Sequence, residues 1–90
     1  MLFDRNVLDW ANRVRAEHNL GEPLTELPKG LIDNSFQCPI ARALGHNTQV
    51  DGEDAYLHSD EHEAINLPPY VRTFVQDFDA GLIPHMVDAA

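Results

Sequence analysis

The chain has 90 residues, one cysteine and a net charge of −9 at neutral pH. A chain this short forms a single domain, residues 1–90, with one small core and little room for a deep catalytic cleft, and one cysteine excludes an internal disulfide. The composition also argues against direct nucleic-acid binding and membrane insertion, because there is neither a cluster of Lys and Arg nor an apolar run of about 20 residues.

The negative charge is concentrated in the second half of the chain. Residues 1–45 carry six acids and five bases, whereas residues 46–90 carry nine acids and one base, Arg72. Such an acidic half is either a solvated surface that keeps a small protein in solution or a surface that attracts a basic partner. Because the chain begins without the basic and apolar regions of a secretory signal, we expect a cytoplasmic protein.

The first predicted element is an amphipathic helix over about residues 4–18, capped by Asp4 and followed by the breaker NLGEP. The apolar residues at helical spacing are Phe3, Val7, Trp10, Ala11 and Val14. The opposite face carries a series of i,i+4 charges, Arg5, Asp9, Arg13 and Glu17. The next segment predicts an ordered loop, because disordered linkers do not carry so many large apolar groups. The leucines expected to pack onto the core are Leu20, Leu24, Leu27 and Leu31.

The stretch FQCPIARALGH, residues 36–46, contains the only cysteine. It predicts a short helix with Cys38 as N-cap, Pro39 at the first helical position and Gly45 just past the end. A helix N-terminus lowers a thiol pKa, so a nucleophile is one interpretation. The nearest possible base, His46, lies at the other end of this helix, roughly 11–12 Å away at 1.5 Å per residue, too far for a thiol–imidazole pair. We therefore expect Cys38 to be a buried structural residue.

Residues 47–66 change to a strand pattern. Asp51-Gly52 is a strong hairpin signal, and residues 59–61 allow a second reversal. We expect antiparallel strands near residues 47–50, 54–58 and 62–66. If His58 pairs with His62, Tyr56 lies opposite Ala64 on an outer face. The other face, expected to be buried, carries Ala55, Leu57 and Ile65.

This hairpin also provides the alternative of a metal site. His58 and His62 would lie side by side with Asp60 and Glu61 in the turn between them, and imidazoles and carboxylates are Zn²⁺ ligands. No third or fourth ligand has a recognisable spacing. Cys38 and His46 would complete a set only if the short helix folds over the hairpin, so we expect the domain to fold without a metal or other cofactor.

The last predicted helix, LPPYVRTFVQDFDAG, begins at a proline and ends before Gly81. Val71, Phe74, Val75 and Phe78 form its apolar face. Asp77 and Asp79 lie in the last turn, where the helix dipole disfavours anions, and this mismatch favours a use in binding a basic partner. The following segment predicts a short turn that packs Leu82, Ile83, Met86 and Val87.

These elements predict a small α+β domain in which two main helices and a short third helix pack on a two- or three-stranded antiparallel hairpin sheet. No glycine-rich phosphate loop, Ser/His/Asp arrangement or pair of carboxylates in an apolar setting is visible, so we expect no enzyme. The main functional hypothesis is binding of a protein with a basic surface. The predicted partner face consists of Asp51, Glu53, Asp54, Tyr56, Asp60, Glu61, Glu63, Asp77 and Asp79. A metal-binding module built on His58 and His62, and an acidic mimic of DNA, are the alternatives.

Four stretches, WANRVRAEHNL, LPKGLIDNSFQCPIARALG, LPPYVRTFVQDFDAG and IPHMVD, resemble a set of small uncharacterised proteins of actinobacteria and their bacteriophages, especially mycobacteriophages. The similarity spans most of the chain, but no catalytic or binding residue carries over from it. The resemblance implies expression in a bacterial cytoplasm. It also implies a role in which a small accessory phage protein binds a protein of its host.

Overall fold

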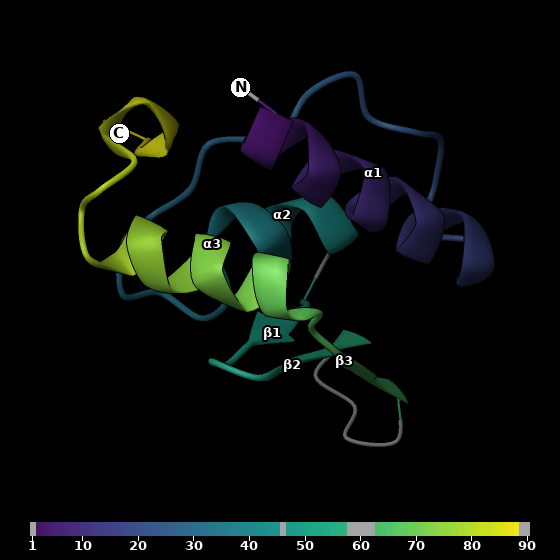
Figure 1. Cartoon of the computed structure of the whole chain (residues 1–90). Coiled ribbons are helices and arrows are strands. Elements are labelled where there is room, and N and C mark those ends of the chain that lie inside the picture. The colour runs from purple at the N-terminus through teal and green to yellow at the C-terminus, as the bar shows by residue number, and fades with distance from the viewer. Residues whose placement is uncertain (1, 46, 58–62, 89–90) are drawn as a thin grey trace.

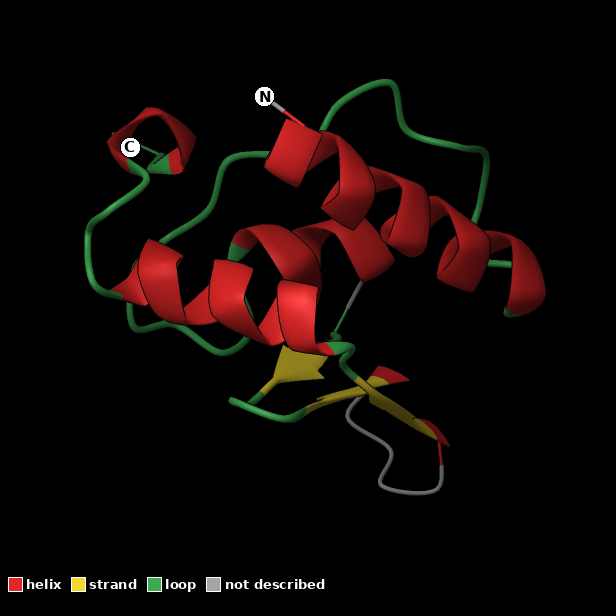
Figure 2. Ribbon diagram, in the orientation of Figure 1, coloured by secondary structure: helices red, strands yellow, loops and turns green. Residues whose placement is uncertain are grey.

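The computed structural model describes residues 2–45, 47–57 and 63–88, in which helices pack on an antiparallel sheet, the predicted α+β arrangement (Figure 1). The first α-helix packs against both of the other α-helices, and the sheet lies beneath the helices (Figure 2). No helix in the described ranges is long and apolar enough to cross a membrane. In chain order, the elements are α1 (Leu2–Glu17), α2 (Pro39–Leu44), β1 (Gln49–Val50), β2 (Asp54–Tyr56), β3 (Ala64–Asn66), α3 (Pro69–Asp79) and the 3₁₀ helix η3 (Pro84–Met86).

Helix α1 buries Val7, Trp10, Ala11 and Val14 of the predicted face, and packs against α2 and α3. The side chain of Phe3, also predicted for this face, lies outside the described ones. It begins at Leu2, so Asp4 lies inside the helix and the prediction that it is the N-cap is wrong. The predicted charge series does not form ion pairs within the described residues. Arg13 instead donates a hydrogen bond to the hydroxyl of Tyr70 on α3, because exposed i,i+4 pairs gain only a few tenths of a kcal/mol and are easily replaced.

The loop after α1 is ordered, as predicted. The side-chain amide of Asn12 donates to the carbonyl of Leu24 at 3.0 Å and accepts from its N–H at 2.8 Å. These two bonds hold the loop against α1, so that Leu27 is buried and Leu20 and Leu24 pack against the core. Leu31 is only half-buried.

Helix α2 is the centre of the core, and its ends follow the predicted pattern. Cys38 is the N-cap, its Sγ accepts the N–H of Ala41 at 3.4 Å, and Pro39 opens the helix. Gly45 closes it with φ 120°, in the region that favours glycine. A Cβ on Gly30 would lie 2.5 Å from Gln37 O, so the preceding loop approaches the start of α2 as only glycine allows.

The sheet has the order β1-β2-β3 and is antiparallel throughout. Tyr56 pairs with Ala64, which confirms the predicted register, and Ala55 and Leu57 are buried on the predicted inner face. The strands are shorter than predicted. The first turn is also displaced by one residue, because the N–H of Asp51 bonds to the carbonyl of Asp54 and the two central residues are 52 and 53.

Helix α3 has the predicted buried face and ends in a Schellman motif. The N–H of Gly81, at φ 79°, bonds to Phe78 O, and the N–H of Leu82 bonds to Asp77 O. Beyond this turn Met86 is buried, and Ile83 and Val87 pack against the core. Leu82 is 69% exposed, so the prediction that it packs on the core is wrong.

Candidate functional site

Three aspartates from separate segments line one hollow of about 310 Å³. Asp33 comes from the loop before α2, Asp51 from the β1–β2 turn and Asp79 from the end of α3. We call this feature the acidic hollow. Its described lining contains no Lys, Arg or His; the other lining residues are Asn34, Ser35, Cys38, Val50, Gly52, Val75 and Gln76.

Hydrogen bonds from backbone N–H groups bring these segments together. The N–H of Val50 donates to the carbonyl of Ser35 at 2.8 Å, which places the loop before α2 along the edge of β1. The N–H of Asp33 donates to Oδ1 of Asp79 at 3.2 Å. Asp33 has φ 56°, a left-handed conformation that Asp and Asn tolerate better than other non-glycine residues. Asp79 therefore has an intramolecular role at the helix end, besides its unfavourable position in the helix dipole.

Asp51 holds the turn at the edge of the hollow. Its Oδ1 accepts the N–H groups of Glu53 and Asp54, each at 2.7 Å, and its Oδ2 accepts the hydroxyl of Tyr56 at 3.0 Å. Partial burial raises the pKa of this carboxyl, but the hydrogen bonds from Asp54, Glu53 and Tyr56 outweigh that effect and lower the pKa below its usual value. Asp51 is therefore ionised at neutral pH.

Cys38 lies in the lining of the acidic hollow and is buried, as predicted. Burial raises the pKa of its thiol, and the negative charge of Asp79 acts in the same direction. Together they outweigh the N–H groups of Ala41 and Ile40, which favour the thiolate. The thiol is thus protonated at neutral pH, which makes it a poor nucleophile and a poor metal ligand.

The other residues of the predicted partner face differ in exposure and in hydrogen bonding. Glu53 and Glu63 are exposed, and Asp77 is half-buried. Asp54 accepts a hydrogen bond from the side-chain amide of Asn66 at 3.1 Å. Tyr56 is half-buried, and its hydroxyl is bound to Asp51, so it does not present a free apolar anchor. Asp60 and Glu61 lie outside the described residues.

The metal hypothesis rests on side chains that lie outside the described residues: His46, His58 and His62. Within the described ranges, no group of three or more His, Cys, Asp or Glu side chains is arranged to hold a metal ion. That statement includes the three carboxylates of the acidic hollow. The metal-binding module remains a prediction.

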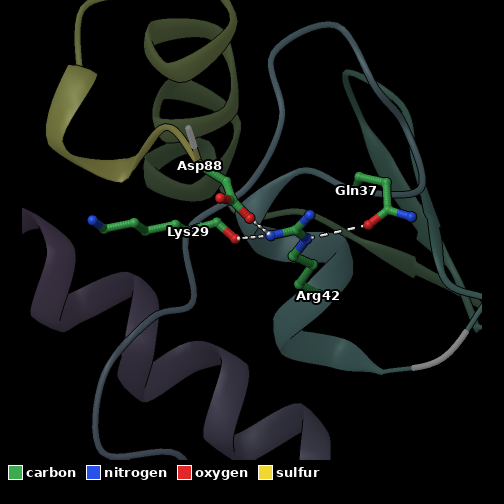
Figure 3. Close-up of polar contacts among 4 residues, drawn as sticks. All are labelled: Lys29, Gln37, Arg42 and Asp88. Carbon is green, nitrogen blue, oxygen red and sulfur yellow. Dashed lines mark hydrogen bonds and ion pairs between the residues drawn. The ribbon is translucent and has the colours of Figure 1, made fainter. Parts of the chain in front are cut away.

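A second junction joins distant segments through opposite charges (Figure 3). Nη1 of Arg42, on α2, lies 2.8 Å from Oδ2 of Asp88 and 2.8 Å from the carbonyl oxygen of Lys29, and Nε donates to Gln37 at 3.2 Å. Beside it, Gly30 bonds through its N–H to Met86 O and through its carbonyl to the N–H of Asp88. We call this cluster the Arg42 junction, and it ties the last described residues to α2.

Two further hollows are described. One, of about 840 Å³, lies between α1 and the loop held by Asn12, and its lining mixes Arg5 with Asp9 and Glu26 over an apolar floor. The other, of about 400 Å³, lies beside Arg42 and the exposed ring of Phe36. Neither gathers charge of one sign, which distinguishes both from the acidic hollow.

Sequence reasoning identified Asp51 and Asp79 but missed Asp33. The chain separates Asp33 from Asp79 by 46 positions, and no local pattern marks their contact. The only local signal was the Asp-Asn pair at residues 33 and 34, which is typical of a turn with a left-handed residue.

The architecture and the site thus define a small α+β domain with an acidic hollow at the junction of its sheet and its last helix. No protein family, curated protein or solved structure matches the chain.

Proposed function

We propose that the protein is a non-enzymatic, cytoplasmic binding protein that docks a basic surface of a partner protein on the acidic hollow. One observation carries the proposal: three aspartates from three segments line one hollow whose described lining has no cation. Such a lining presents negative charge, which a Lys or Arg from a partner complements.

The surroundings of the hollow support the same partner. Glu53 and Asp54 continue the negative charge along the β1–β2 turn, and the half of the chain after residue 45 has nine acids against one base. A negative field of this kind steers a basic partner toward the site and raises the association rate. Because exposed charges are screened over about 8–10 Å at physiological salt, association should slow as salt is added.

The groups in the lining favour binding over catalysis. Ser35 and Cys38 are its only hydroxyl and thiol, and the described lining offers no histidine to activate either. The Cys38 thiol is protonated, and Asp51 is ionised and already bonded to two N–H groups. The chemistry that remains is acceptance of hydrogen bonds and attraction of cations.

The test is a pull-down from an actinobacterial lysate, which the sequence resemblance makes the natural source. The hollow variant carries Asp33→Asn and Asp79→Asn, which remove two charges and keep the oxygen that accepts the N–H of Asp33. The control carries Glu17→Gln and Glu22→Gln, which remove two charges from exposed sites around the end of α1.

We expect wild type and control to recover the same basic protein, and the hollow variant to lose it. Added NaCl at 0.5 M should also release that protein. Equal recovery by the hollow variant and the control, with both variants shown to be folded, would contradict the proposal.

A further inference from the structure

Two large apolar side chains are exposed near the acidic hollow. Leu82, just beyond α3, is 69% exposed, and Ile32, in the loop before α2, is 37% exposed. Phe36 is the third large apolar residue exposed among the described ones, at 48%, and it lines the hollow beside Arg42 instead. Single exposed apolar residues are ordinary on protein surfaces. Their exposure bears on binding only if they lie next to a binding site.

Hydrogen bonds on both sides of Ile32 attach the loop before α2 to residues 79–88, the segment that contains Leu82. Gly30 bonds to Met86 and Asp88, and Asp33 bonds to the side chain of Asp79. Ile32 therefore lies between two attachments to residues 79–88. Figure 1 shows this loop and the chain between α3 and η3 passing the same end of α3. Asp33 directly follows Ile32, and Asp79 lies three residues before Leu82.

The exposure of Leu82 has a local cause. In a Schellman motif, the second residue after the helix cap commonly packs on an apolar residue three or four positions from the helix end. Here Leu82 occupies the outer position, but the corresponding helix residues are Asp77 and Gln76, both polar. Leu82 thus has no apolar partner on its own helix, while Ile83 and Met86 are turned toward the core.

We propose that Ile32 and Leu82 are the apolar anchors of the partner interface, and that the partner presents an apolar side chain directly beside a Lys or Arg. This inference rests on the proposed function and adds the chemistry of the recognised segment. Charge complementarity identifies the occupant: a segment that covers Ile32 and Leu82 lies next to Asp33 and Asp79 and has to carry positive charge there. Apolar anchors then supply affinity, and the charges supply orientation and rate.

The test uses two synthetic heptapeptides of equal charge, Gly-Ser-Arg-Leu-Arg-Ser-Gly and the same peptide with serine in place of leucine. Binding to the full chain is measured by fluorescence anisotropy. We expect the leucine peptide to bind about fivefold to tenfold more tightly than the serine peptide, as burial of one partly covered leucine predicts. Ile32→Ser with Leu82→Ser should remove this preference and leave the affinity for the serine peptide unchanged. Phe36→Ser, the matched control, should keep the preference.

The outcomes separate the inference from the proposed function. Equal affinity of wild type for both peptides, with binding that still requires Asp33 and Asp79, overturns the inference and leaves the proposed function in place. A preference that survives in the Ile32/Leu82 variant, or disappears in the Phe36 variant, also overturns the inference. Failure of both peptides to bind contradicts both proposals.

Discussion

The Arg42 junction and the acidic hollow both join segments that are distant in the chain, but they do so with opposite charge balance. At the Arg42 junction a guanidinium faces the carboxylate of Asp88 and two neutral oxygens. At the acidic hollow, three aspartates line one cavity with no cation in the described lining. The same loop, residues 29–37, contributes to both. At the Arg42 junction a cation of the chain balances the carboxylate. At the acidic hollow, no Lys, Arg or His of the described lining balances the aspartates.

The arginines show why cations are absent from the hollow. Each of three arginines donates to a backbone carbonyl: Arg15 to Ala43, Arg42 to Lys29 and Arg72 to Leu67. These bonds fix loops and helix ends, where unpaired carbonyls need donors. Half of the six Lys and Arg residues are thus used in holding the fold, and nine acids against one base remain in the half of the chain after residue 45.

The largest effect is expected at the Arg42 junction, from Gly30→Ala. The new Cβ would lie 2.5–2.6 Å from backbone atoms of Gln37, Cys38 and Pro39, which cannot move as a side chain can. We expect a loss of about 3 kcal/mol in the free energy of unfolding, measured by urea denaturation. Gly52→Ala is the matched control, because nothing lies within 4 Å of its Cβ, and should change stability by less than about 0.5 kcal/mol. Equal losses from both would show that the close packing of Gly30 is unimportant.

A smaller effect is expected from the guanidinium itself. Arg42→Met keeps the aliphatic stem and removes the bonds to Lys29, Gln37 and Asp88, so we expect a loss of about 1–2 kcal/mol. Asp88→Asn removes the charge of the ion pair and leaves the bonds from Arg42 to Lys29 and Gln37 in place. Because both partners are about a third exposed, at 28% and 32%, it should cost less than about 1 kcal/mol. If Asp88→Asn is as damaging as Arg42→Met in thermal melts, the ion pair rather than the carbonyl bond holds the junction.

Cys38 tests whether the hollow is also a reactive site. Cys38→Ser keeps an acceptor for the N–H of Ala41 and should change stability by less than about 1 kcal/mol, whereas Cys38→Ala should lose about 1 kcal/mol as a missing N-cap. The native thiol should react with a thiol reagent only as fast as the protein unfolds, since it is buried and protonated. Rapid labelling of the folded protein at neutral pH would restore the nucleophile hypothesis.

A gain in stability is expected from neutralising the hollow. Asp79→Asn keeps the acceptor for Asp33 and removes a negative charge from a helix C-terminus, where the helix dipole repels anions, so we expect a gain of a few tenths of a kcal/mol. Glu53→Gln, which removes one exposed charge away from a helix end, is the control for net charge. A loss of stability in Asp79→Asn would mean that the charged hydrogen bond to Asp33 outweighs the repulsion.

The smallest effect concerns the titration of Asp51. Its pKa is lowered in the folded state, so its contribution to stability is present above the unfolded pKa, roughly 4, and is lost as the pH falls through the lower folded value. Tyr56→Phe removes one of the hydrogen bonds that lower the pKa and should move it upward. The measurement is an NMR titration of the Asp51 side-chain carboxyl between pH 6 and pH 2. An unchanged pKa in Tyr56→Phe would show that the backbone N–H groups alone cause the shift.

Most helix boundaries and the hairpin register were predictable, because their signals are local. Pro39 and Gly45 bracket α2, and Pro69 and Gly81 bracket α3, since proline suits the first helical position and glycine the left-handed residue after the last. The register that pairs Tyr56 with Ala64 follows from the alternation of apolar residues around a short turn. Local rules failed for Asp4, which lies inside α1, and for the exact position of the Asp51 turn.

The acidic hollow, the Arg42 junction and the exposure of Ile32 and Leu82 could not be predicted from local sequence patterns. Asp33 and Asp79, like Arg42 and Asp88, meet across 46 positions, and periodicity, propensity and capping reach only about four residues. The sequence already showed that the half after residue 45 is acidic. It did not show that Asp33, from the more balanced half, belongs to the same hollow, or that Leu82 points outward. Those facts follow from how loop 29–37 packs between β1, the end of α3 and residues 86–88, and such packing depends on contacts between all these segments at once.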